Sequence, residues 1–189
     1  MQDLVTLFFD IIVFAIPVLL AITVHEAAHG YAARHFGDQT AAALGRITLN
    51  PLAHIDLLGT IIMPIGLLIL TQGAFVFGYA KPVPVNFTKL RNPTRDMMWV
   101  ALAGPASNFI QAFIWALLLA IGYKIGLSQT YFIKIASVGV TVNLILCALN
   151  LFVIPPLDGG RIMVSLLPYN LQSCWQGLSA TGLLLLSVY

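Results

Sequence analysis

The residues with the clearest chemical potential are His25, Glu26 and His29, which form a His-Glu-x-x-His pattern. On an α-helix, residues four positions apart lie on the same face, so both imidazoles can present a ring nitrogen to one metal ion. Zinc binds imidazole nitrogen at about 2.0–2.1 Å, and the carboxylate between the histidines can act as a general base toward a water molecule. The pattern therefore predicts a hydrolytic zinc site with Glu26 as its base.

This pattern lies at the inner end of an apolar segment that begins at Leu4. Of the 189 residues, 59% are hydrophobic and only 8% are charged, whereas a soluble domain carries about 25% charged residues. We therefore predict an integral membrane protein, and the net charge of +2 gives no reason to expect nucleic-acid binding. Water-consuming chemistry in such a segment indicates cleavage of a peptide bond inside the membrane.

Apolar runs and turn residues predict an all-α polytopic membrane protein with about four to six membrane-embedded segments. We expect residues 1–189 to form a single intramembrane metalloprotease domain. Its three-helix catalytic core is predicted at residues 4–31, 97–123 and 131–167, with a membrane-dipping segment at 57–79 and a final helix from about 174 that is short for a complete span.

The distribution of charge predicts the topology. Residues 32–56 and 79–96 carry six of the nine basic residues, and the positive-inside rule places both stretches on the cytoplasmic side. The segment between them must then enter the membrane and return, which its proline and glycine residues allow where protein shields the backbone. The same parity brings His29 and Asp158 to one depth, on the cytoplasmic side.

Two short β elements are also expected on that side. Residues 47–49 can form a short strand, and Val83, Val85 and Phe87 alternate as in an edge strand. An edge strand can add an unfolded substrate segment by backbone hydrogen bonding.

A catalytic zinc site usually has three protein ligands, so the two histidines need one more. The candidates are the remaining histidine and aspartate side chains near the predicted cytoplasmic ends: His35, His54, Asp38, Asp56 and Asp158. Asp158 is favoured because it lies in an apolar run, where an unpaired carboxylate costs about 2.5–3.5 kcal/mol on insertion scales. The prolines and glycines around Asp158 would unwind the helix and turn the carboxylate inward.

Five sequence blocks occur in one order along the chain, and together they resemble the site-2 protease family, in particular its minimal prokaryotic branch without PDZ domains. The blocks are residues 25–29, 45–51, 78–86, 104–108 and 150–159. The resemblance implies one Zn²⁺ per chain, held by His25, His29 and Asp158, with Glu26 as base. It also implies that Asn150 stabilises the scissile carbonyl or oxyanion and that Asn108 lies near the substrate path. Val153 stands where the family commonly has proline.

The prediction from this reasoning is a zinc-dependent intramembrane endopeptidase that cleaves transmembrane helices of membrane-protein substrates. We expect it to be a multi-pass protein of a prokaryotic inner membrane, with its active site toward the cytoplasm and the lipid bilayer as its other partner. The alternatives are a catalytically silent, zinc-stabilised membrane scaffold and a metal transporter, since intramembrane histidine and aspartate also line ion paths. The sequence does not predict the oligomeric state.

Overall fold

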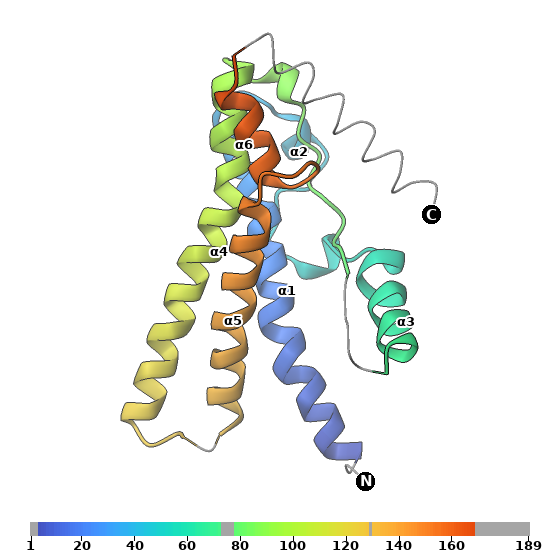
Figure 1. The fold of residues 1–189 in the computed structure, drawn as a ribbon, viewed down its shortest axis with the longest axis vertical. Coiled ribbons are helices and arrows are strands. Elements are labelled where there is room, and N and C mark those ends of the chain that lie inside the picture. Colours follow the sequence, from blue (N-terminus) through green and yellow to red (C-terminus); the bar gives the residue numbers. More distant parts are fainter. Residues whose placement is uncertain (1–3, 73–77, 129, 169–189) are drawn as a thin grey trace.

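A computed structural model describes residues 4–72, 78–128 and 130–168, and the regular structure there is helical. Figure 1 shows the arrangement of these elements. In chain order they are α1 (Leu4–His35), α2 (Thr40–Ala43), η1 (Pro51–Ala53), η2 (Leu57–Ile62), α3 (Met63–Leu70), η3 (Phe87–Lys89), α4 (Pro93–Lys124), α5 (Tyr131–Leu151) and α6 (Asp158–Leu166).

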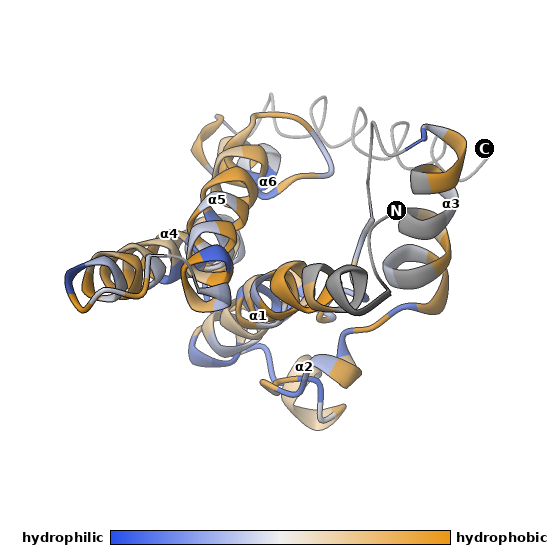
Figure 2. Cartoon of the chain, turned by 90° about the horizontal axis from the view of Figure 1, so that it is seen from below, coloured by the Kyte–Doolittle hydropathy of each residue, from blue (hydrophilic) through white to orange (hydrophobic). Residues whose placement is uncertain are grey.

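Three of the described helices are long and apolar enough to cross a membrane: Ile11–His35 in α1, and the whole of α4 and α5. Helix α4 is central, because it packs against α1, α5 and α6. At its contact with α5, a Cβ at Gly139 would overlap the ring of Trp115, so the glycine lets the two helices approach closely. Large apolar side chains are exposed along α4 and α5, among them Phe109, Phe113, Leu144 and Ile145, and hydrophobic residues recur along both helices in Figure 2. The prediction of an all-helical integral membrane protein is confirmed.

The long helices begin and end where their local chemistry requires. Pro93 occupies the first turn of α4, where its missing N–H leaves no backbone donor unpaired. Asp96 caps the same turn by accepting a hydrogen bond of 2.8 Å from the Asn92 N–H. Helix α1 stops before Gly37, whose φ of +113° suits glycine.

The C-terminal end of α1 and the N-terminal end of α4 lie side by side. The Arg91 N–H donates to the Phe36 carbonyl oxygen over 3.0 Å, and the Asn86 N–H donates to the Asp38 carboxylate over 2.7 Å. Helix α6 lies at this same end, and the connection between α4 and α5 lies at the opposite end (Figure 1). Helices α1 and α4 therefore run antiparallel and share one polar end, which we call the α6 end.

The two ends of residues 57–79 also meet. The Tyr79 N–H donates to the Gly59 carbonyl over 3.0 Å, and the Thr60 hydroxyl donates to the Tyr79 carbonyl over 2.9 Å. Between these ends, the six-residue π-helix η2 leads directly into α3, which has eight residues. Helix α3 stands apart from the three long helices in Figures 1 and 2.

Some sequence-based boundaries need correction. No strand occurs in the described part of the chain, so residues 47–49 are not the predicted strand. Single backbone bonds, such as that from the Lys81 N–H to the His54 carbonyl (2.9 Å), replace a ladder, and Pro82 and Pro84 have no N–H to contribute. The unwinding expected around Asp158 lies slightly earlier, at residues 152–157, and Asp158 and the two glycines after it belong to α6. The final helix expected from about 174 lies outside the described residues.

Candidate active site

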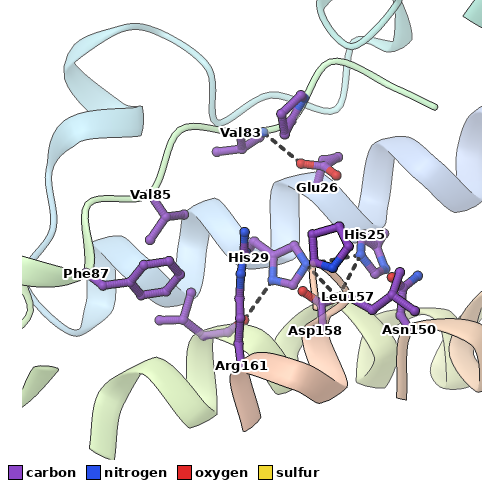
Figure 3. A pocket seen from close by; sticks show the side chains of 13 residues that line it. His25, Glu26, His29, Val83, Val85, Phe87, Asn150, Leu157, Asp158 and Arg161 are labelled. Carbon is purple, nitrogen blue, oxygen red and sulfur yellow. Dashed lines mark hydrogen bonds and ion pairs between the residues drawn. The ribbon is translucent and has the colours of Figure 1, made fainter. Parts of the chain in front are cut away.

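Two helices bring three side chains to one point (Figure 3). His25 and His29 lie one turn apart on α1, and their Nε2 atoms are 3.0 Å from each other. Asp158 begins α6, and its Oδ2 atom lies 3.3 Å from each Nε2 atom. All three side chains are buried, with exposed fractions of 6–8%. The structure therefore brings the two histidines and Asp158 together, which is the arrangement expected from the helix spacing and from the matching depth of the three residues.

The break after α5 is what carries Asp158 inward. Helix α5 ends at Leu151, and α6 starts at Asp158. A Cβ at Gly159 would overlap the carbonyl groups of Leu151 and Phe152, and one at Gly160 would lie 2.9 Å from the Pro155 nitrogen. Two consecutive glycines thus allow the first turn of α6 to pack directly against the backbone of the break.

Each imidazole is oriented through its second nitrogen. His29 Nδ1 donates to the Val100 carbonyl oxygen over 2.7 Å, and His25 Nδ1 donates to Asn108 Oδ1 over 2.5 Å. A proton on Nδ1 leaves a lone pair on Nε2, and this is the tautomer that binds a metal through Nε2. Both lone pairs face Asp158.

The donor set fits a zinc ion. With both Nδ1 atoms protonated, the two Nε2 atoms and Asp158 Oδ2 are three acceptors in mutual contact, and Oδ2 is buried without a hydrogen-bond donor. Three acceptor atoms at these distances repel one another unless a cation lies between them. Ligand atoms around a tetrahedral zinc ion lie about 3.3–3.4 Å apart, close to the separations of 3.0 Å and 3.3 Å here. We therefore infer that these residues can hold zinc.

Asp158 is an acid in a buried position, and its Oδ2 atom faces the two Nε2 atoms at 3.3 Å. Burial opposes the charged form of the carboxyl, and with lone pairs on both Nε2 atoms a cation between the three groups is what offsets that cost. A carboxylate that stays charged in a buried position is suited to bind a cation.

Glu26 is on the neighbouring face of α1, next to the cluster. Its Oε2 atom accepts a hydrogen bond of 2.7 Å from the Val83 N–H. That bond uses one of the two carboxylate oxygens, which leaves the other to accept a proton. The catalytic candidate is therefore oriented by the chain segment that passes over it.

That segment, residues 81–86, is attached at both ends, and we call it the strap. At one end the Lys81 N–H donates to the His54 carbonyl over 2.9 Å. Arg46 adds a bond of 3.2 Å to the Lys81 carbonyl oxygen and one of 2.6 Å to that of Ala53. At the other end the Asn86 N–H donates to Asp38 Oδ2 over 2.7 Å.

Asp38 is a buried anchor of the strap. Burial disfavours its charged form, but hydrogen bonds from the Thr40 side chain and from the Asn86 and Thr40 N–H groups outweigh burial and lower the pKa of the carboxyl from its ordinary value of 3.8. Its charge is thus satisfied by protein donors and not by a metal.

The other candidates for a third metal ligand do not lie in the cluster. His54 is buried and donates from Nε2 to the Thr48 carbonyl over 2.9 Å, and Asp56 accepts from the Gly59 N–H over 2.8 Å at the start of η2. The His35 ring packs edge-on against Phe36, with 5.1 Å between ring centroids. Among the described residues, the group able to hold a metal consists of His25, His29 and Asp158.

A cavity of about 310 Å³ opens beside the cluster. Val83, Val85 and Phe87 all line it, together with Pro82, although they do not form the edge strand that their alternation predicted (Figure 3). Asn150 lines it too, while its amide Nδ2 donates to the Leu146 carbonyl over 3.0 Å. Arg161 lies on another wall, with its guanidinium 5.3 Å from the centroid of the Phe87 ring.

Asn108 has a different position from the one expected. It is completely buried and bonded to His25, and it is not among the residues that line the cavity. Two partners of the site were missed by sequence reasoning: the Val100 carbonyl, which has no sequence signal, and Asn143, which accepts from Asn108 Nδ2 over 3.0 Å. An asparagine within the apolar run of α5 is a signal that could have identified the latter.

Residues 13–127 match the family model described as Peptidase family M50. The chain belongs to peptidase family M50, the site-2 protease family. The M50 match includes the His-Glu-x-x-His pattern and Asn108 and ends before Asn150 and Asp158, so the geometry is what links these two residues to the site.

Two curated relatives are described as putative zinc metalloproteases. The chain is 40% identical over 163 residues to "Putative zinc metalloprotease YwhC" of Bacillus subtilis, an alignment that covers 84% of this chain and 70% of the relative. It is 30% identical over 142 residues to "Putative zinc metalloprotease Rip2" of Mycolicibacterium smegmatis, covering 75% of this chain and 52% of that protein. No solved structure matches the chain at a significant level.

Proposed function

We propose that this member of the M50 family is a zinc-dependent intramembrane endopeptidase of the site-2 type. The observation that carries the proposal is the convergence of three buried acceptor atoms, from His25, His29 and Asp158, next to Glu26 on a helix apolar and long enough to span a membrane. One Zn²⁺ per chain would be held by these three residues.

The chemistry divides between the metal and the chain. When bound, zinc acts as a Lewis acid on the scissile carbonyl and lowers the pKa of a water molecule toward 7. Glu26 removes a proton from the attacking water and returns it to the leaving amine. The Val83 N–H keeps the Glu26 carboxylate in place during both transfers. Asn150 would donate its amide N–H to the oxyanion after turning away from Leu146.

The substrate is a transmembrane helix that unwinds locally, because the peptide bonds of an intact helix are shielded by their own hydrogen bonds and side chains. The side chains of Val83, Val85 and Phe87 face the cavity, which supports an extended substrate segment lying along the strap. The lipid bilayer delivers such a substrate laterally.

The site is proposed to lie toward the cytoplasmic face of a prokaryotic inner membrane, with residues 57–79 entering the membrane and returning. Support comes from the bond between the Tyr79 N–H and the Gly59 carbonyl, which joins the two ends of that segment. The concentration of basic residues in 32–56 and 79–96 agrees with a cytoplasmic location.

The deciding variant is Glu26→Gln, which keeps the size of the side chain and removes the base. We expect its zinc content to equal that of the wild type and its proteolysis to be lost. Proteomics of membrane fragments should find peptides released by cells with the wild type that are absent from cells with Glu26→Gln.

Two results would contradict the proposal. Retained cleavage in Glu26→Gln would reject the mechanism. Wild-type and variant cells with identical fragment profiles, while both proteins contain zinc, would favour the silent scaffold or the transporter.

A further inference from the structure

We infer that Asn143 on α5 sets the metal-binding tautomer of His25, acting through Asn108 on α4. Asn143 is then a positioning residue, because it touches neither the substrate nor the metal. The inference rests on the proposed zinc site, whose ligands lie on α1 and α6, and extends it to α4 and α5.

The two asparagines form a continuous chain of hydrogen bonds across the helices. Asn143 Nδ2 donates to the Gly139 carbonyl over 2.9 Å, and Asn143 Oδ1 accepts from Asn108 Nδ2 over 3.0 Å. Asn108 Oδ1 then accepts from His25 Nδ1 over 2.5 Å. Both asparagine side chains have an exposed fraction of 0%, so water does not compete for these bonds.

These hydrogen bonds have only one consistent polarity, which the Gly139 carbonyl determines over 2.9 Å and the Ala21 carbonyl supports by accepting from Asn108 Nδ2 over 3.5 Å. A backbone carbonyl can only accept, so Asn143 must turn its NH₂ group toward Gly139 and its oxygen toward Asn108. Asn108 must then present its own NH₂ group to that oxygen, which turns Oδ1 toward His25. An acceptor at this place requires the proton of His25 on Nδ1 and leaves the lone pair of Nε2 for the metal.

The two histidines therefore reach the same tautomer by different routes. His29 Nδ1 bonds directly to a backbone carbonyl, that of Val100, which cannot reverse its role. His25 bonds to an amide, and an amide can rotate to offer either a donor or an acceptor. Without Asn143, the amide orientation of Asn108 is held only by the long bond of 3.5 Å from its Nδ2 atom to the Ala21 carbonyl. Asn108 can then turn its NH₂ group toward His25, which would move the proton to Nε2, where it blocks the metal.

A purely structural role for Asn143 is the competing explanation, since polar pairs also join membrane helices. Helix packing and tautomer control predict different effects of removing Asn143 on stability and on the His25 tautomer. Loss of packing lowers stability and leaves the His25 tautomer unchanged. Loss of the fixed direction of the hydrogen bonds through Asn108 changes the His25 tautomer in a protein that still folds.

The test uses Asn143→Leu in the full chain, purified in detergent and stripped of metal. Leucine has the same number of side-chain heavy atoms, branched at the same carbon, and neither donor nor acceptor. ¹⁵N NMR of histidine-labelled protein reports which ring nitrogen of His25 carries the proton. We expect Nδ1–H in the wild type and a shift toward Nε2–H in Asn143→Leu. Zinc affinity, measured by competition with a chelator, should fall by about 10–100-fold.

Thr141→Val is the matched control on the same helix. Thr141 donates from its hydroxyl to the Ser137 carbonyl over 3.0 Å, four residues earlier, as Asn143 does to Gly139. The control thus removes the same type of bond without touching Asn108. We expect its zinc affinity and its His25 tautomer to equal those of the wild type.

Asn143→Asp should restore the pattern. Burial favours the protonated carboxyl, which accepts from Asn108 with one oxygen and donates to Gly139 with the other. Its zinc affinity should lie well above that of Asn143→Leu, and equal losses in the two variants would overturn the inference. An unchanged His25 tautomer in Asn143→Leu would also overturn it, even if wild-type protein binds zinc and cleaves. Failure of the wild type to bind zinc at all would instead reject the proposed function.

Discussion

At the scale of single residues, Gly104 controls how closely α4 approaches the two histidines. A Cβ at this position would overlap the His29 ring and lie 2.6 Å from His25 Cε1. We expect Gly104→Ala to displace the imidazoles and lower zinc affinity by at least about tenfold, the lower end of the effect of disturbing groups around a metal ligand. Isothermal titration of the metal-stripped protein with zinc measures this change.

Gly66→Ala is the control for that variant, because a Cβ at Gly66 in α3 would have no neighbour within 4 Å. The exchange of glycine for alanine in a helix is the same in both variants. Equal zinc affinities for Gly104→Ala and Gly66→Ala would mean that the contact between α4 and the imidazoles does not affect the metal.

Asn150 supplies a second test at this scale. It lines the cavity, yet its Nδ2 atom is engaged with the Leu146 carbonyl. If it turns to bind the oxyanion, Asn150→Ala should retain zinc but cleave about 10²–10³-fold more slowly, as for loss of one oxyanion donor. Single-turnover cleavage of a substrate identified by proteomics gives the rate. A rate within twofold of the wild type would leave Asn150 with only its helical hydrogen bond.

At the scale of elements, the strap and its anchor Asp38 connect the loop between α1 and α2 to the proposed catalytic base, Glu26. The Asp38 carboxylate holds the Asn86 N–H at one end of the strap, and the Val83 N–H holds Glu26 near its middle. Because the pKa of Asp38 is lowered on folding, its charged form stabilises the folded protein. That contribution is complete above the ordinary pKa of 3.8 and disappears as the pH falls through the lower pKa of the folded state.

The variant Asp38→Asn tests this pH dependence of stability. It should unfold at a lower temperature than the wild type near pH 7. The difference between the two midpoints should stay constant down to about pH 4 and shrink only below that pH. Comparing the two proteins cancels effects of pH on the metal site, which both share. A difference that vanishes already by pH 6 would contradict the assignment of a lowered pKa to Asp38.

The elements also show how far the sequence could predict the site. The spacing of His25 and His29 determines their shared face, and the carboxylate of Asp158 in an apolar run requires a partner, so both were predictable. A break near Asp158 was expected from the prolines and glycines there, and the structure places it at residues 152–157, with both glycines inside α6. The strap, by contrast, depends on bonds between residues far apart in sequence, such as Asn86 with Asp38, and alternation alone suggested a strand.

Asn108 shows that contacts between different helices also could not be predicted from the sequence. Its presence in a short block predicted importance, but its partner His25 is 83 residues away, and only packing of α4 against α1 brings them together. Sequence spacing therefore indicates which residues share a helix face, whereas the contacts between helices decide which residue orients which.

At the scale of the whole molecule, the remaining question is which ends share a side of the membrane. The bond between the Arg91 N–H and the Phe36 carbonyl places residues 36 and 91 together, so the chain between them begins and ends at the α6 end. Within that interval η2 and α3 form one run from residue 57 to residue 70, which is at most about 21 Å long at a rise of 1.5 Å per residue, against a hydrocarbon core of about 30 Å. We therefore expect residues 57–79 to enter the membrane without crossing it.

Cysteine labelling tests this topology in a background without Cys147 and Cys174. Gln39 and Thr88 are exposed at the α6 end, and Ser128 is exposed in the connection between α4 and α5 at the opposite end. A membrane-impermeant maleimide applied to spheroplasts should label only Ser128→Cys, and after permeabilisation it should also label Gln39→Cys and Thr88→Cys. Labelling of Gln39→Cys and Thr88→Cys from opposite faces would mean that residues 57–79 cross the membrane. Asp158 would then follow an odd number of further crossings after His29 and could not share its metal, so this outcome would also reject the zinc site.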